Sequence, residues 1–185
     1  DGMVHGVHFH DGKADYRNRF IDSDGLREER EKGHWIYPGM NMYGDLIAKG
    51  EMPKSKNTGN TAMVYHQGQL YALMEGAKPY KLSLPELATE GETDFDGTLT
   101  HNFTAHPKVD VNSGEMLTFG YSPMPPFLTY SVINPEGKAV HTKEITIPKG
   151  IMMHDFAITE NYSIFPDLPL TFDFEKLMKG ESMIG

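Results

Sequence analysis

Strand pairs bounded by turn residues recur along this sequence at a nearly constant interval, and this recurrence constrains the fold more than any other feature. Three hairpin turns are marked by Gly68, Gly114 and Asn161, which are 46 and 47 residues apart. A period of about 40–50 residues with several strands per unit is typical of a β-propeller blade. Each blade is a small antiparallel sheet beside a central axis. The sequence therefore predicts an all-β propeller.

Short alternating segments support this class over most of the chain. Residues 3–20 alternate on both sides of Asp11-Gly12, and Asp-Gly between two such runs is a strong hairpin signal. Further strand patterns lie at 61–76, 114–122, 127–147 and 152–172. The turns within these later segments fall at Gln67-Gly68, at 135–137 and at Glu160-Asn161.

Two segments do not follow the strand pattern. Residues 24–32 are charged and rich in helix-forming residues, which predicts a short solvated helix with Asp24 as its cap. Residues 49–60 contain turn-forming residues without periodicity and predict a loop.

Composition excludes several classes of protein. A length of 185 residues suits one domain. The net charge of −9 is spread along the chain, so we expect no nucleic-acid partner, which would require a basic face. The chain has no cysteine, which excludes disulfides, thiolate metal sites and a cysteine nucleophile. No apolar run approaches the roughly 18–20 residues of a membrane span.

The two ends of the sequence indicate a portion of a longer protein. The first residue is Asp1, no signal peptide is visible, and residues 174–185 show no closing element. We therefore expect residues 1–185 to be a partial β-propeller domain, a fragment of a longer single-domain chain.

Two histidines occupy matching positions in the repeat. His106 and His154 each stand just ahead of a strand, 48 residues apart, so in a propeller both would converge on the axis. Neutral imidazole is a ligand for iron, copper, nickel and zinc. Glu75, near the end of the strand that follows Gly68, could accept a ring N–H from such a ligand. On the pattern alone, a more frequent explanation is that the two histidines are ordinary polar residues at the mouth of a channel. Glu75 is then a solvent-facing residue at the end of a strand.

Four segments of the chain resemble the carotenoid cleavage oxygenase family, which includes the lignostilbene dioxygenases and the vertebrate retinoid isomerase. They cover residues 1–20, 59–84, 103–121 and 153–170 in order. The most specific part is "AHPKVD" at 105–110 followed by "HDFAITENY" at 154–162. The resemblance extends over nearly the whole chain.

This resemblance implies a seven-bladed propeller with Fe(II) on its axis. In the family, four histidines hold the iron, three glutamates support those histidines, and dioxygen cleaves a conjugated carbon–carbon double bond into two carbonyl products. By motif, His106 matches the first histidine ligand, His154 the second, and Glu75 the first supporting glutamate. Family members run to well over twice this length, so we expect this chain to be an N-terminal-to-middle portion of about half the propeller. The other ligands belong to parts of the family sequence that these residues do not include. His34, His66, His101 and His141 stand in no motif that would replace them, so we expect the isolated 185 residues to bind iron weakly and to be inactive.

The substrate implied by the resemblance is an apolar carotenoid or apocarotenoid, with dioxygen as the second reactant. Stilbene-cleaving relatives tend to carry a lysine where this chain has Met74, and stilbene cleavage is the alternative. We expect a cytoplasmic protein with peripheral membrane contact. A propeller scaffold without redox chemistry is the competing class, and a relative that retains iron but isomerises or hydrolyses its substrate is a third reading.

Some residues outside these motifs also have two interpretations. His8 and His10 share a strand face and are either a metal pair or part of an exposed hairpin face, the commoner case. Phe127 and Tyr130, around a proline-rich stretch, are candidate tunnel residues.

Overall fold

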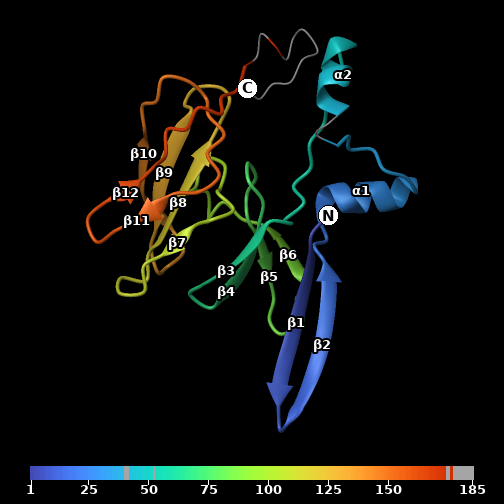
Figure 1. The fold of residues 1–185 in the computed structure, drawn as a ribbon. Coiled ribbons are helices and arrows are strands. Elements are labelled where there is room, and N and C mark those ends of the chain that lie inside the picture. Colours follow the sequence, from blue (N-terminus) through green and yellow to red (C-terminus); the bar gives the residue numbers. More distant parts are fainter. Residues whose placement is uncertain (40–41, 52, 174–175, 177–185) are drawn as a thin grey trace.

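Two antiparallel four-stranded sheets form the centre of the structure, a computed structural model that describes residues 1–39, 42–51, 53–173 and 176 (Figure 1). The first sheet contains β3 (Ala62–His66), β4 (Gln69–Leu73), β5 (Tyr80–Leu82) and β6 (Thr89–Glu92). The second contains β7 (Lys108–Val109), β8 (Met116–Tyr121), β9 (Leu128–Ile133) and β10 (Ala139–Glu144). In both sheets, strands that are consecutive in sequence are neighbours, which is the arrangement of a propeller blade.

The periodic turns predicted from sequence each lie in the first hairpin of a unit. Gln67 and Gly68 join β3 to β4 with φ values of 48° and 83°, and Gly114, with φ of 74°, lies between β7 and β8. The third hairpin joins β11 (Ala157–Ile158) to β12 (Ser163–Ile164) around Asn161. The predicted repeat is therefore confirmed. The strands of 152–172 are shorter than predicted, because each pairs over only two residues.

A long hairpin precedes the sheets and projects away from them (Figure 1). It consists of β1 (Met3–His10) and β2 (Lys13–Phe20), paired without a register shift. The loop residues Asp11 and Gly12 have φ of 46° and 72°, as a tight two-residue hairpin loop requires. At the base of the hairpin, Val4 packs into the cluster of the first sheet.

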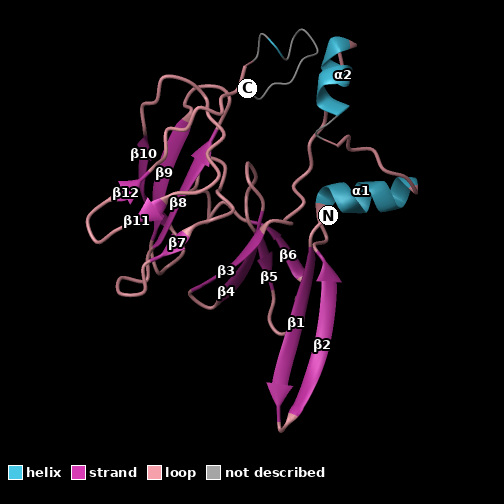
Figure 2. Ribbon diagram, viewed as in Figure 1, coloured by secondary structure: helices cyan, strands magenta, loops and turns pink. Residues whose placement is uncertain are grey.

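Both helices lie on the side of the molecule away from β7–β12 (Figure 2). The helix α1 (Asp24–Lys32) matches the predicted range, but Asp24 as its cap was wrong. Ser23 has the extended backbone of a cap, and its hydroxyl accepts the Leu26 N–H at 3.1 Å. The helix α2 (Tyr43–Ala48) was not predicted. The described residues of 49–60, which exclude residue 52, form no helix or strand, as predicted.

Apolar clusters between neighbouring sheets hold the units in place. One cluster joins β4 to the second sheet through Leu73, Phe103 and Met116. Another joins the second sheet to the third unit through Phe119, Met153 and Phe156. Because Phe103 and Met153 are almost completely buried in these clusters, the segments just before β7 and β11 are each anchored to the second sheet.

Residues 174–185, in which the sequence indicated no closing element, lie outside the described residues except for residue 176. Among the helices that the structure describes, none is both long and apolar enough to cross a membrane.

Candidate metal centre

Three side chains from successive units meet, each from a residue just outside a strand. Glu75 follows β4, His106 precedes β7 and His154 precedes β11. Each offers one ligand atom, and these atoms lie within 4.8 Å of one another. The Nε2 atoms of the two histidines are 3.0 Å apart, and their ring planes are inclined at 61°. The structure thus brings together all three residues that the sequence singled out.

His106 is held by the short segment that leads into β7. Its backbone N–H donates to Thr104 Oγ1 at 3.0 Å, and Phe103 and Ala105 beside it are buried. Pro107 follows and restricts the preceding residue to extended backbone. The imidazole therefore projects from a backbone that has little freedom.

An ion pair connects the His106 segment with the His154 segment. Lys108 Nζ lies 2.7 Å from Asp155 Oδ1, and the same oxygen accepts the Phe156 N–H at 2.8 Å. Although partial burial opposes ionisation of Asp155, Lys108 and this N–H lower the pKa of its carboxyl. An ionised Asp155 therefore ties the residue next to His154 to a residue two positions after His106.

Glu75 supports the His154 ring from behind. Its side chain is only 17% exposed, and Oε1 contacts His154 Nδ1. Oε2 accepts a hydrogen bond from the Tyr121 hydroxyl at 3.1 Å. Burial, and next the charge of Glu75, raise the pKa of Tyr121. The phenol therefore stays protonated and remains a donor to this carboxylate.

These contacts determine which nitrogen of His154 is free to bind a cation. A carboxylate is an acceptor only, so the ring nitrogen that faces Glu75 is the one that carries the proton. The lone pair of His154 then lies on Nε2, which points at His106 Nε2. A carboxylate–histidine pair of this kind is what orients an imidazole that ligates a metal.

The three residues fit a metal ion of the imidazole-binding class. With metal–imidazole bonds of about 2.1 Å, two ligands at a right angle have nitrogens about 3.0 Å apart, and the two Nε2 atoms show a separation of 3.0 Å. Apart from His154 Nδ1, the buried Glu75 Oε1 has no polar partner among the described residues. The His154 side chain is 63% exposed, which leaves room for further ligands.

The other histidines considered as ligands have different partners. His66 is buried and its Nε2 lies 2.8 Å from the Gly114 carbonyl oxygen. His101 Nε2 lies 2.7 Å from Ser131 Oγ. His34 Nδ1 contacts the Lys32 carbonyl, and His141 packs against the Tyr130 ring. None of these joins the centre formed by Glu75, His106 and His154.

Residues considered for substrate contact also have structural partners. Met74 Sδ accepts the backbone N–H of Thr58 at 3.3 Å, which turns its thioether toward the loop before β3. Tyr130 packs against Phe165 at a ring distance of 5.7 Å, within the cluster that joins β9 to the third unit. Phe127 is partly buried just before β9.

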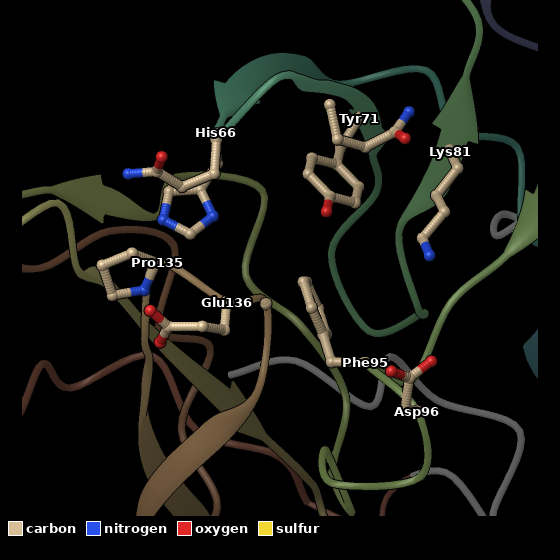
Figure 3. A pocket seen from close by; sticks show the side chains of 10 residues that line it. His66, Tyr71, Lys81, Phe95, Asp96, Pro135 and Glu136 are labelled. Atoms are coloured by element: carbon tan, nitrogen blue, oxygen red, sulfur yellow. The ribbon is translucent and has the colours of Figure 1, made fainter.

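A separate pocket of about 170 Å³ lies between the turns of the first two sheets (Figure 3). His66, Tyr71 and Lys81 line it from the first sheet, and Pro135 and Glu136 line it from the turn after β9. Neither Glu75 nor the two histidines of the metal centre line this pocket, so it is distinct from that centre.

Comparison with known proteins identifies relatives over the whole chain. The family profile described as "Retinal pigment epithelial membrane protein" matches residues 1–185. Carotenoid 9,10(9',10')-cleavage dioxygenase of Crocus sativus is 43% identical over 204 residues, which cover 100% of this chain and 37% of the relative. Carotenoid 9,10(9',10')-cleavage dioxygenase 1 of Phaseolus vulgaris is 44% identical over 201 residues, with the same coverage.

A solved structure supports the fold. The crystal structure of Pseudomonas brassicacearum lignostilbene dioxygenase matches with a TM-score of 0.85 and 37% identity, covering 100% of this chain and 39% of that one. The predicted fold, a portion of a β-propeller, is confirmed by this match and by the two blade-like sheets. The chain spans about 37% of the length of the curated relatives, in agreement with the predicted partial propeller.

Proposed function

The chain belongs to the carotenoid cleavage oxygenase family, and from this premise we propose that the protein is a non-haem Fe(II) dioxygenase. In this proposal it cleaves a conjugated double bond of a carotenoid or apocarotenoid with dioxygen. Residues 1–185 form part of a single propeller domain, and further blades supply the remaining ligands. One observation supports the chemistry most strongly: the two Nε2 atoms, from successive units, face each other at 3.0 Å.

In the proposed centre, His106 and His154 hold the iron through Nε2. Iron(II) bound there would supply the one-electron chemistry that dioxygen needs in order to react with an alkene. Glu75 keeps the proton of His154 on Nδ1, and the Tyr121 hydroxyl keeps Glu75 in place at 3.1 Å. The pair of Lys108 and Asp155 fixes the spacing of the two ligand segments.

A set of neutral imidazoles leaves the charge of the cation uncompensated by its direct ligands. A carboxylate hydrogen-bonded to the far side of a ring raises the basicity of that ring and fixes its orientation. Glu75 meets this need without occupying a coordination position, since its Oε1 contacts Nδ1 rather than Nε2. Positions that the protein leaves open are then available to reactants.

The names of the relatives support a carotenoid over a stilbene. Both curated relatives described above are named carotenoid 9,10(9',10')-cleavage dioxygenases, whereas the solved structure is a lignostilbene dioxygenase. We therefore propose a carotenoid or apocarotenoid as the substrate class and a hydroxystilbene as the alternative. Because carotenoids dissolve in lipid, we also propose a cytoplasmic protein that contacts membranes peripherally, which flotation with phospholipid vesicles would test.

The test uses the intact, iron-loaded protein with a C40 carotenoid and, separately, a hydroxystilbene. We expect the carotenoid absorbance to fall and two carbonyl products to appear, each carrying one atom from ¹⁸O-labelled dioxygen. His154→Ala should abolish both iron retention and cleavage, and His34→Ala is the matched control on an exposed loop. Cleavage of the stilbene alone would overturn the substrate class. Full folding without iron or turnover would favour a scaffold, and an isomer or hydrolysis product without oxygen uptake would favour the third reading.

A further inference from the structure

The β1–β2 hairpin presents a second group of metal-binding side chains. His8 and His10 of β1 and Asp15 of β2 each offer one ligand atom, and these atoms lie within 4.8 Å of one another. His8 and His10 alternate onto the same face of the strand. Asp15 is the direct cross-strand partner of His8, so pairing of the strands brings the carboxylate to the two rings.

The geometry within this group is already partly assembled. His10 Nε2 lies 2.6 Å from Asp15 Oδ2, and the centroids of the His8 and His10 rings are 5.0 Å apart with their planes inclined at 27°. Asp11 Oδ2 lies 4.0 Å from His10 Nδ1 and adds a second negative charge nearby. Lys13 pairs with His10 across the strands. It carries the one positive charge among the direct cross-strand partners of His8, His10 and Asp15.

We propose that His8, His10 and Asp15 form a second metal site, which binds a divalent ion of the Zn²⁺ or Cu²⁺ class. Two imidazoles and one carboxylate suit these ions, which bind such donors more tightly than Mn²⁺ or Fe²⁺ does. The ligand side chains are accessible, since His10 is 39% and Asp15 73% exposed. An ion from solvent can therefore reach all three ligand atoms, which already lie within 4.8 Å of one another.

This site is separate from the proposed iron centre in position and in role. Figure 1 shows the tip of the hairpin pointing away from both four-stranded sheets. The hairpin makes its buried contact near its base, where Val4 joins the cluster of the first sheet. A ligand that binds only the paired form of two strands stabilises their pairing. A metal bound to both β1 and β2 would therefore hold together the outer half of the hairpin.

The test compares zinc binding to the intact, iron-loaded protein and its variants by equilibrium dialysis and elemental analysis. We expect wild type to bind one more zinc ion per chain than His8→Ala/His10→Ala, with equal iron content in both. His5→Ala is the matched control, because His5 lies on the opposite face of β1, with its Nδ1 2.5 Å from the Tyr16 hydroxyl. It should keep the additional zinc.

A second variant guards against a loss of hairpin structure. Asp15→Asn retains the shape of the side chain but removes its charge, and we expect it to weaken zinc binding measurably while the double variant abolishes it. In wild type, Cu²⁺ should give an electron paramagnetic resonance spectrum with splitting from two nitrogens. An equal zinc count in wild type and the double variant would overturn the proposal, as would an equal loss in His5→Ala.

Discussion

Replacing Tyr121 with phenylalanine tests whether Glu75 is fixed in order to orient His154. The substitution removes only the hydroxyl that donates to Glu75 Oε2 at 3.1 Å. The ring remains and keeps its packing near Phe119 and Phe172, at centroid distances of 6.5 and 6.1 Å. The change therefore isolates one hydrogen bond to a carboxylate that is only 17% exposed.

The magnitude follows from the charge and burial of this carboxylate. A hydrogen bond to a charged group contributes about 1.5–3 kcal/mol, and a partly buried acceptor that loses its donor keeps the desolvation cost. Loss of a residue that orients a metal ligand typically lowers metal affinity about 10–100-fold. Since Glu75 retains its contact with His154 in this variant, we expect an effect near the lower end, about tenfold.

The assay is competition for Fe(II) against a chromophoric chelator, combined with thermal unfolding of the iron-free protein. Tyr65→Phe is the matched control, because Tyr65 is 59% exposed on β3 and should bind iron like wild type. Unchanged iron affinity in Tyr121→Phe would refute the reasoning. So would a loss of stability of the iron-free protein that leaves the affinity intact, because it would show a purely structural role.

Three further predictions concern stability. Burial lowers the pKa of His101, so below about pH 6.5 the unfolded chain binds a proton that the folded protein does not. The stability of the folded protein should therefore fall as the pH is lowered through that range. In a profile of melting temperature against pH, His101→Gln should remove this fall. Lys56, at 2.5 Å, lowers the pKa of Glu29 from 4.5 to about 2, so the stability difference between wild type and Glu29→Gln should be present above pH 4.5 and vanish as pH falls to about 2. Phe119 is fully buried between the second sheet and the third unit, and Phe119→Ala should cost about 3–5 kcal/mol in denaturant unfolding; a cost below about 1 kcal/mol would contradict this account of the core.

The strand repeat could be predicted from sequence because turn residues act locally. Gly68 and Gly114 adopt positive φ, a requirement that the residue type reveals without knowledge of the rest of the fold. The helix α2 was missed because Pro38, Gly39 and Gly44 interrupt its surroundings and mask a helical pattern. The cap of α1 was misplaced by one residue because Ser23 and Asp24 are both good capping residues.

The supporting contacts of the candidate centre could not be predicted in the same way. Tyr121 and Glu75 are 46 residues apart in sequence, and Lys108 and Asp155 are 47 apart. Such pairs depend on how neighbouring sheets pack, which local patterns do not specify. A usable signal did exist for one pair, since Lys108 and Asp155 lie within the same two motifs as His106 and His154.

The most direct test of the account is an anomalous difference map of the intact protein, recorded at the iron absorption edge. We predict one strong peak within bonding distance, about 2.1 Å, of the Nε2 atoms of both His106 and His154, with Glu75 on the far side of the His154 ring. A peak elsewhere, or two imidazole rings turned away from a common centre in the iron-loaded crystal, would contradict it.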